Sequence, residues 1–157
     1  MGSRKVLTLV LLREGRRVLL GMKKRGFGVG KWNGFGGKVE LGETIAEAAA
    51  REVKEECGLI VDPVDLEETG EMEFEFKGDP VKLEVHVFQT RKFSGEITES
   101  EEMRPEWFEE DAVPYKSMWL DDELWYPYMF KNQNFRAYFL FEGHDNMLVH
   151  KIDLVNK

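Results

Sequence analysis

Cysteine is nearly absent from this sequence, because Cys57 is the one cysteine in 157 residues. A single thiol cannot form a disulfide within the chain, and structural disulfides belong to secreted rather than reducing compartments. We therefore expect a protein of a reducing compartment. A cytoplasmic location is the first expectation, with the mitochondrial matrix and the nucleus as alternatives. Cys57 itself is interpreted as a small residue at a helix end.

Long hydrophobic runs are also absent. The apolar stretch Val6–Leu12 contains Thr8 and ends in charged residues. A membrane-spanning helix needs about 20 consecutive apolar residues. We therefore expect neither a membrane span nor a signal peptide, and no membrane partner.

Positive charge is in deficit, with 22 Lys and Arg against 30 Asp and Glu, for a net charge of −8. Surfaces that coat DNA or RNA are basic, so we expect no nucleic acid polymer as a partner. A nucleotide substrate is not excluded, since a bound metal ion reverses the local sign of charge. The three histidines are scattered, without the spacing of metal ligands.

Repeats, low-complexity segments and linkers are missing as well. A chain of this length with 42% apolar residues can bury one sizeable core. We predict one domain over residues 1–157, acting as a monomer.

The strongest local signal lies between Gly37 and Leu59. Thr44 and Glu47 have the spacing of a capping box, and the residues up to Cys57 are good helix formers. Gly58 is placed for a left-handed helix end. The sequence therefore predicts a helix that begins after Thr44 and ends before Gly58.

Three acids of this helix point in an unexpected direction. At about 100° per residue, Glu52, Glu55 and Glu56 fall on the same side as Ile45 and Ala49, which seek the core. An acidic helix end is usually a solvated face, but these carboxylates continue an apolar one. Carboxylates that cannot face bulk water need cations, and oxygen ligands suit a hard ion such as Mg²⁺, with Mn²⁺ as an alternative. We predict a metal site here.

The glycine-rich segment Lys23–Gly37 precedes the helix. A flexible surface loop is the ordinary interpretation, but its aromatic residues are unusual for such a loop. Glycines allow close approach of the backbone to a ligand, and lysines supply point charges for phosphate. We predict the mouth of a polyphosphate and nucleoside site. The residues behind this prediction are Lys23, Lys24, Arg25, Phe27, Lys31, Trp32, Phe35 and Lys38.

The rest of the chain is typical of strands around one further helix. Asp121 and Asp122 precede that helix, where the ordinary role of one of them is an N-cap, and Pro127 is expected in or near its first turn. The predicted strands are Val6–Leu12, Val18–Met22, Glu71–Phe76, Val81–Gln89, Phe135–Glu142 and Asn146–Leu154, and the helix is Glu123–Lys131.

Gly37–Leu59 follows the pattern Gly-x5-Glu-x7-Arg-Glu-apolar-x-Glu-Glu-x-Gly-apolar, and it resembles the Nudix box at every fixed position. LGMKKRGFGVGKWNGFGGKVE, FEF, EEMRPEWF and MWLDDELWYP resemble the MutT-homologue branch of that family, the oxidised-purine nucleoside triphosphate diphosphatases. The resemblance implies an α/β (α+β) fold, with a mixed β-sheet sandwiched between α-helices. It also implies Mg²⁺-dependent cleavage of 8-oxo-dGTP, 2-oxo-dATP and related oxidised or methylated purine nucleotides to the monophosphate and pyrophosphate.

The resemblance also assigns roles to individual residues. The implied catalytic residues are Arg51, Glu52, Glu55, Glu56 and Glu102, with Glu43 helping Arg51 to orient the helix acids. The implied metal ligands are Glu52, Glu55, Glu56, Glu102 and the carbonyl oxygen of Gly36. The implied substrate-binding residues are Thr8, Lys23, Phe27, Asn33, Phe35, Gly36, Gly37, Lys38, Phe74, Phe76, Leu83, Trp119, Leu120, Asp121, Asp122, Trp125 and Phe141. Leu83 and Leu120 depart from the methionine and proline of the family pattern, which leaves the fine substrate preference open.

Three other functions compete with this one. A Nudix hydrolase of a dinucleoside polyphosphate or ADP-ribose would not need the Trp-Leu-Asp-Asp segment. A non-catalytic Nudix module that binds RNA or a protein would be expected to lack box acids, which are all present here. A purely structural α/β module leaves the acids on the core side of the helix unexplained.

Overall fold

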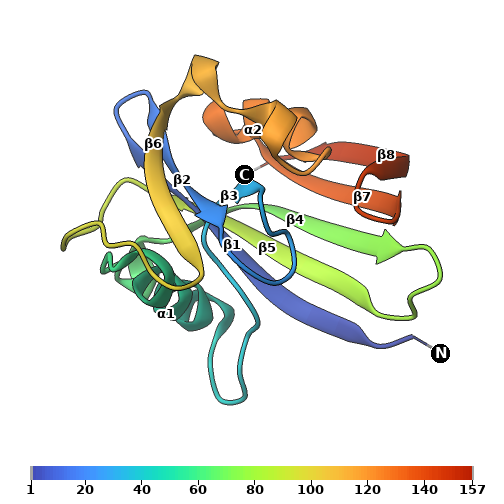
Figure 1. The fold of residues 1–157 in the computed structure, drawn as a ribbon, viewed down its shortest axis with the longest axis horizontal. Helices are drawn as coiled ribbons and strands as arrows, with labels where there is room; N and C mark the ends of the chain where they lie inside the picture. The colour runs from blue at the N-terminus through green and yellow to red at the C-terminus, as the bar shows by residue number, and fades with distance from the viewer. Residues whose placement is uncertain (1, 157) are drawn as a thin grey trace.

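The structure is a computed structural model that describes residues 2–156, so the first and last residues of the predicted domain lie outside it (Figure 1). Two α-helices and eight strands make up the fold, with three short 3-10 turns between them. The strands are β1 (Arg4–Glu14), β2 (Arg17–Lys23), β3 (Trp32–Asn33), β4 (Glu67–Phe76), β5 (Lys82–Thr90), β6 (Met103–Glu109), β7 (Asn134–Glu142) and β8 (Asn146–Val155). The helices are α1 (Ile45–Cys57) and α2 (Asp122–Phe130), and the turns are η1 (Pro63–Asp65), η2 (Glu110–Ala112) and η3 (Tyr115–Ser117).

All eight strands join one mixed sheet in the order β3-β2-β1-β5-β4-β7-β8, with β6 paired to β2. The pairs β1·β5 and β4·β7 are parallel, and the other strand pairs are antiparallel. Within residues 2–156, no helix is both long and apolar enough to cross a membrane.

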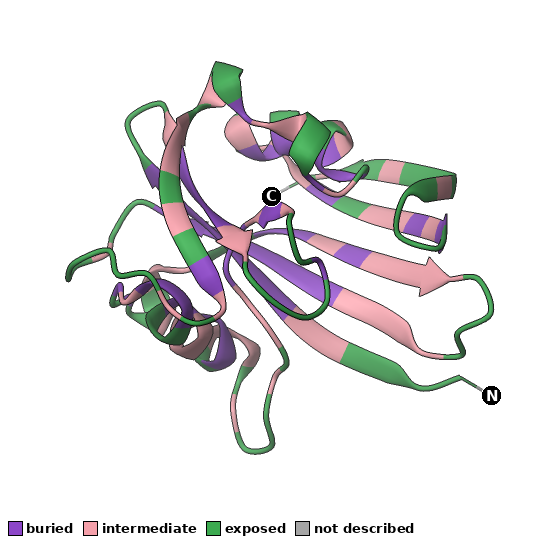
Figure 2. Cartoon of the chain, in the orientation of Figure 1, coloured by how far each residue is buried: buried purple, intermediate pink, exposed green. Residues whose placement is uncertain are grey.

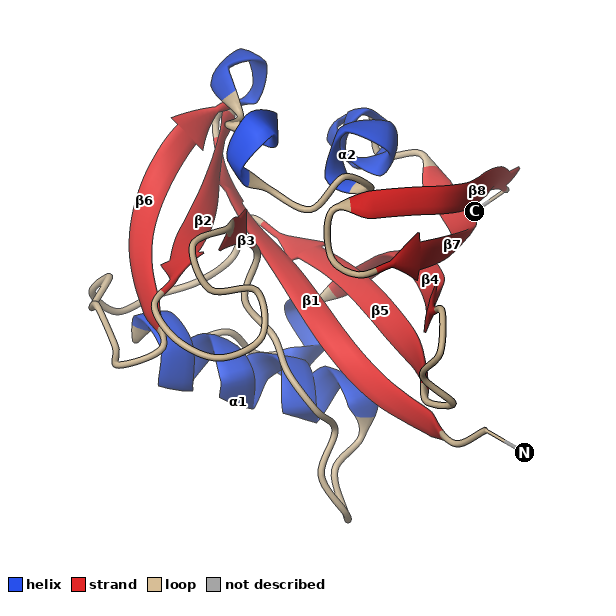
Figure 3. Cartoon of the chain, turned by 45° about the vertical axis from the view of Figure 1, so that its right-hand side comes forward, coloured by secondary structure: helices blue, strands red, loops and turns tan. Residues whose placement is uncertain are grey.

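The sheet is covered on both faces, which explains the near-continuous apolar sequence of β1. Successive side chains of a strand point to opposite faces. Leu9 and Leu11 belong to the core that contains α2, whereas Val10 and Leu12 belong to the core under α1. Figure 3 shows the two helices on opposite sides of the sheet, and Figure 2 shows that the buried residues concentrate at its centre. The predicted fold class, a mixed sheet between helices, is confirmed.

Helix α1 forms as its sequence predicts. The Thr44 side chain accepts from the Glu47 amide at 3.1 Å, and the Glu47 side chain accepts from the Thr44 amide at 2.8 Å. Gly58 ends the helix at φ 81°, a conformation that favours glycine. Cys57 is fully buried, and burial raises the pKa of its thiol to about 11. It is therefore a core residue, as its position suggested.

Strand β1 changes its partner along one edge, from β2 to the segment at residues 35–38. Near its end, β1 pairs with β2 over Leu12–Glu14. Closer to its start, residues 35–38 take over the same edge through isolated bridges, Val10 to Phe35 and Leu7 to Lys38. Beyond the shared region, β2 pairs with β3 at Gly21 and Met22, whereas β6 pairs with β2 from Arg17 to Lys23. The glycine-rich segment is thereby held against β1 and beside α1.

Three details of the predicted elements were wrong. Strands β3 and β6 were not predicted, and β4 begins at Glu67 rather than at Glu71. Pro127 lies inside α2, not in its first turn. Proline lacks the amide that would donate to the carbonyl four residues earlier, so a hydrogen bond is missing within the helix. Burial of Trp125, Tyr126 and Met129 against the sheet holds α2 in place despite this loss.

A histidine-centred cluster lies on the sheet face opposite Leu83 and Val85. The ring nitrogens of His86 lie 3.0 Å from Glu68 and 2.7 Å from Glu84, and Glu71 is 3.8 Å away. The ligand atoms of Glu71, Glu84 and His86 lie within 4.8 Å of one another, a spacing compatible with a metal ion. Arg4 already lies 3.6 Å from Glu84, and Arg136 lies 3.9 Å from Glu71. We assign no ion to this cluster, which is an ionic network.

The network predicts a pH-dependent contribution of His86 to stability. Burial alone would lower the pKa of His86, but the hydrogen bonds with Glu84 and Glu68 raise it above its ordinary value. Stability from a raised histidine pKa is fully present below the unfolded value of about 6.5, and it is lost as pH rises through the folded value. His86→Gln should lower the Tm by about 2–4 °C at pH 6, equivalent to about 1 kcal/mol, and by less at pH 9.

Thermal melts followed by circular dichroism at both pH values measure this difference. His150→Gln is the matched control, since His150 is exposed on β8. An equal Tm loss for His86→Gln at pH 6 and pH 9 would show that packing, not charge, accounts for the role of His86.

Candidate active site

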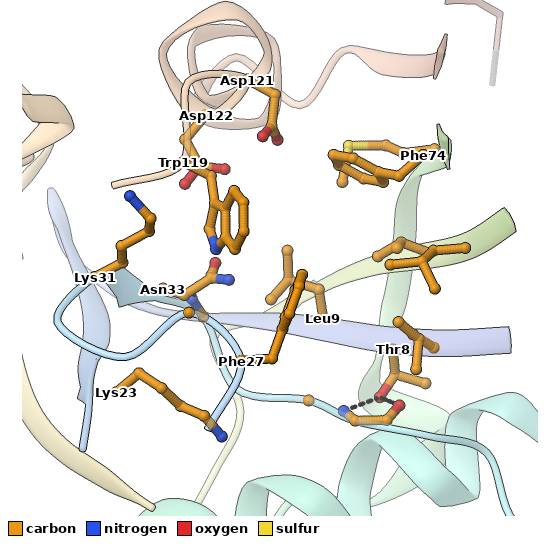
Figure 4. Close-up of a pocket in the computed structure, with 18 of the residues that line it drawn as sticks. Thr8, Leu9, Lys23, Phe27, Lys31, Asn33, Phe74, Trp119, Asp121 and Asp122 are labelled. Carbon is orange, nitrogen blue, oxygen red and sulfur yellow. Dashed lines mark hydrogen bonds between the residues drawn. The ribbon is translucent and has the colours of Figure 1, made fainter. Parts of the chain in front are cut away.

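A pocket of about 290 Å³ opens between the sheet, the glycine-rich segment and the start of α2. Apolar side chains of β1, β4 and β5 form one part of its walls (Figure 4). Most of the predicted substrate residues line it, namely Thr8, Lys23, Phe27, Asn33, Gly36, Gly37, Phe74, Phe76, Leu83, Trp119, Asp121 and Asp122. Glu56 of α1 lines it too, so base-sized apolar space and the helix acids share one pocket.

Two adjacent aspartates enter the pocket from the start of α2, at the end opposite Thr8 (Figure 4). Asp121 and Asp122 are each only 2% exposed. The indole Nε1 of Trp125 donates to one Asp121 oxygen at 2.9 Å. The other Asp121 oxygen and one Asp122 oxygen are buried without a hydrogen-bond partner. Buried polar atoms need partners, and a proton held by the two neighbouring carboxyl groups would supply one, either between the groups or to the polar edge of a ligand.

The same burial changes the charge state of the aspartates. Burial raises the pKa of Asp121, and the pKa of Asp122 is raised by burial and then by the neighbouring charge of Asp121. The helix-cap interpretation of Asp121 is wrong, because Asp121 precedes α2 but its side chain makes no capping hydrogen bond. Its bond with Trp125 takes the place of that cap.

Aromatic side chains form the outer wall of the pocket. Phe27 stacks on Trp119, with ring centroids 5.1 Å apart and planes 25° apart. Phe76 meets both rings nearly edge-on, at 6.0 Å from Phe27 and 6.4 Å from Trp119. The ammonium of Lys31 lies 5.3 Å from the Trp119 ring. Phe27, Phe76 and Trp119 all line the pocket, so this wall is aromatic.

The acids of α1 lie beside the glycines of the preceding segment. Glu56 is 7% exposed and accepts from the Gly36 amide at 2.9 Å. Burial raises the pKa of Glu56 to about 8, and burial also raises the pKa of Glu52. Glu55 is more open, with 58% of its side chain exposed. The three carboxylates therefore run from the pocket to the surface.

Arg51 holds these acids in position. Its guanidinium donates to Glu43 at 2.6 and 2.9 Å, to Glu52 at 2.8 Å and to Glu55 at 3.2 Å. It also donates to the carbonyl oxygen of Lys38 at 3.1 Å. The hydrogen bonds from Arg51 lower the pKa of Glu43. Arg51 thus connects Lys38 of the loop and Glu43 before the helix with Glu52 and Glu55 of α1.

The glycines next to these acids leave room that any side chain would fill. A Cβ at Gly37 would lie 2.7–2.8 Å from the carboxylate atoms of Glu52, and a Cβ at Gly36 would lie 1.8 Å from the Thr8 carbonyl oxygen. The groups gathered here offer oxygen donors, which hard divalent cations prefer. The carboxylates of Glu52, Glu55 and Glu56 are donors of the kind that suit a hard divalent cation.

Glu102 reaches this region from the loop before β6. It pairs with Lys23 at 2.8 Å and with Arg25 at 2.7 Å, and these hydrogen bonds lower its pKa. Its charge is also near enough to raise the pKa of Glu56. The structure thus brings Glu102 together with Lys23 and the acids of α1.

Five predicted substrate residues do not line the pocket. Phe35 is fully buried in the core under α1. Trp125 is fully buried and donates to Asp121. Phe141 is fully buried against Phe74 and Phe76. The remaining two are Leu120, which is 38% exposed, and Lys38, which is exposed and contributes its carbonyl oxygen to Arg51.

Several residues that line the pocket were not predicted. Met72 and Val85 could have been found, because they alternate with Phe74 and Leu83 along β4 and β5. Leu7 and Leu9 flank Thr8 on β1, and Met103 opens β6. Only the tertiary arrangement identifies Met103, since its strand was not predicted.

Comparison with known proteins shows to which family the chain belongs. The profile of the NUDIX domain matches residues 2–129. The chain belongs to the NUDIX family. The predicted resemblance is confirmed, and the matched region contains the box, Glu102 and both pocket aspartates.

Two curated NUDIX relatives match over nearly their whole length. The oxidized purine nucleoside triphosphate hydrolase of Danio rerio is 54% identical over 99% of this chain and 98% of its own. The protein of the same name from Mus musculus is 47% identical over 97% of this chain and 96% of its own. Among solved structures, the MutT protein of Bacillus halodurans superposes with a TM-score of 0.84 at 26% identity, covering 95% of this chain and 97% of that one.

Proposed function

We propose that this NUDIX protein hydrolyses oxidised purine nucleoside triphosphates, among them 8-oxo-dGTP and 2-oxo-dATP, to the monophosphate and pyrophosphate. The observation that carries the proposal is the buried pair of carboxyl groups of Asp121 and Asp122, which lines an aromatic pocket. The names of the Danio rerio and Mus musculus relatives support the same substrate class. Such an activity removes damaged precursors before they are incorporated into DNA.

The aromatic wall and the aspartates would together select the base. A purine stacked on Trp119 would present its polar edge toward Asp121 and Asp122. An ionised carboxylate only accepts hydrogen bonds, whereas a protonated one also donates. Because burial raises both pKa values and the charge of Asp121 raises that of Asp122 further, the pair can hold one proton and match an edge that offers both donors and acceptors.

The acidic end of the pocket would bind the polyphosphate. Glu52, Glu55, Glu56, Glu102 and the Gly36 carbonyl would hold Mg²⁺, for which Mn²⁺ can substitute. A bound divalent cation supplies charge neutralisation for the phosphates and lowers the pKa of a bound water. Lys23, now paired with Glu102, would turn toward the phosphates. Glu56 and Glu102 are the two candidates for the base that accepts the proton of the attacking water.

The rival functions fit the pocket less well. A hydrolase of ADP-ribose or of a dinucleoside polyphosphate does not need two buried aspartates at the base end. A non-catalytic binding module does not need the oriented set of Arg51, Glu52 and Glu56. We further propose that the protein acts as a monomer on free nucleotides, without a nucleic acid polymer, in the cytoplasm.

A nucleotide panel tests this function. The protein is incubated with Mg²⁺ and 8-oxo-dGTP, 2-oxo-dATP, dGTP, ADP-ribose or a dinucleoside polyphosphate, and the products are separated by chromatography. We expect a monophosphate and pyrophosphate from the oxidised purines, and little product from the others. Faster turnover of ADP-ribose or of the dinucleotide would replace the proposal by the corresponding rival.

Trp119 gives a prediction about binding. Stacking of a base on an aromatic side chain contributes roughly 1–3 kcal/mol, so Trp119→Ala should raise KM about tenfold or more. Trp119→Phe keeps a flat face and should retain much of the affinity. Both variants should keep the far-UV circular dichroism of the wild type. An unfolded Trp119→Ala variant would instead make Trp119 a core residue.

A further inference from the structure

The turn between β7 and β8 lies against aromatic residues that line the pocket, although the turn itself is not part of the lining. Its residue His144 has ring centroids 4.9 Å from Phe27, 5.0 Å from Trp119 and 6.1 Å from Phe76. All three partners line the pocket. A turn near the end of the chain thus reaches the same aromatic wall as the glycine-rich loop near its start.

An ion pair joins this turn to that loop. Asp145 lies 3.2 Å from Lys31, whose ammonium also sits over Trp119. The Asp145 side chain is 88% exposed, and exposed pairs contribute little to folding stability. Its effect is therefore on position: it holds the turn next to Lys31, beside the Trp119 ring.

The hairpin does not itself need an aromatic ring at position 144. Gly143 makes the tight turn at φ +64°, a conformation that favours glycine. His144 is exposed, and its ring contacts within residues 2–156 go to the three pocket aromatics. The position of His144 is explained by the pocket and not by the packing of β7 on β8.

We propose that His144 is a further substrate-binding residue, which contacts the purine base from the β7–β8 turn. The inference rests on the proposed function, since it assumes a purine on Trp119. A base stacked on that indole comes within reach of an imidazole centred 5.0 Å away. The imidazole offers a flat face and an N–H donor. Asp145 acts as a positioning residue, because it holds Lys31 beside the same ring.

Steady-state kinetics of four variants test this role. His144→Ala should raise KM for 8-oxo-dGTP about five- to tenfold and leave kcat within about twofold, because base stacking contributes to binding and not to the chemical step. His144→Phe restores a flat ring and should regain most of the affinity. His150→Ala is the matched control, because His150 is an exposed histidine away from the pocket aromatics, and it should behave as wild type. Asp145→Asn should raise KM about twofold at low ionic strength and not in about 0.5 M salt, where screening already weakens the pair.

The outcomes separate this inference from the proposed function. The wild-type nucleotide panel decides the function, and the ratio of variant to wild-type KM decides the role of His144. If the wild type prefers another nucleotide, the variants are compared on that nucleotide. A wild-type KM for His144→Ala, or a loss confined to kcat, would overturn the inference. An equal effect of Asp145→Asn at low and high salt would overturn the positioning role of Asp145.

Discussion

Replacing Glu56 with glutamine is expected to lower kcat by about 10²–10⁴-fold, as for the loss of a positioned acid–base group. Glutamine keeps the size of Glu56 and an oxygen that can accept from the Gly36 amide. It removes the charge that would hold a divalent cation. Since burial already opposes that charge, the fold should tolerate the change. Single-turnover and steady-state rates at saturating Mg²⁺, with a thermal melt of the same sample, measure both effects.

Glu102→Gln is the companion variant. Glu102 comes from a loop, is 37% exposed and already pairs with Lys23 and Arg25. We expect a clear loss of kcat that is smaller than for Glu56→Gln. Near wild-type turnover of Glu56→Gln would remove Glu56 from the metal site, and an unchanged rate for Glu102→Gln would make Glu102 a solvated loop residue.

Asparagine at position 121 is expected to change which oxidised purine is preferred. In the wild type, a movable proton on the Asp121–Asp122 pair can match a guanine-type edge in one arrangement and an adenine-type edge in the other. Asp121→Asn fixes that position as a neutral amide. The ratio of kcat/KM for 8-oxo-dGTP to that for 2-oxo-dATP should therefore shift by about tenfold or more, the size of one lost hydrogen bond to a charged group. Asp122→Asn should shift the ratio with a different bias.

The pH dependence of this ratio gives the second part of the same test. Burial raises the pKa of Asp121 to about 6 and the pKa of Asp122 further above its ordinary value. Asp121 should lose its proton as pH rises through about 6, while Asp122 keeps its proton to higher pH, so the substrate that needs Asp121 protonated should lose kcat/KM first. Each asparagine variant should flatten this profile. Asp111→Asn, at an exposed position in η2, is the control. Equal losses on both substrates with unchanged profiles would leave the two aspartates without a role in base selection.

The parts of the fold that the sequence predicts are those with local causes. The ends of α1 follow from Thr44 with Glu47 and from Gly58, and each of these two caps involves residues only three or four positions apart. The burial of Glu56 follows from its place on the apolar side of that helix. Such signals need no knowledge of the distant chain.

The errors have tertiary causes. Strand β6 contains Pro105, which usually argues against a strand, yet it pairs with β2 along its whole length. Phe35 belongs to a glycine-rich segment without alternation, so only its bridge to Val10 decides that it faces α1. His144 lies in an ordinary turn sequence, and only the folded hairpin brings it to Trp119. Long-range pairing, which carries no local signal, separates the predicted site from the observed one.

The most direct measurement of the central claim compares kcat/KM for 8-oxo-dGTP with kcat/KM for undamaged dGTP, at neutral pH and saturating Mg²⁺. Sites built on buried hydrogen bonds reject analogues that leave these groups unpaired by large factors. We predict a preference of at least about a hundredfold for the oxidised nucleotide, with the monophosphate and pyrophosphate as products. Equal values for the two nucleotides, or orthophosphate as the product, would contradict the claim that Asp121 and Asp122 select a damaged base for this cleavage.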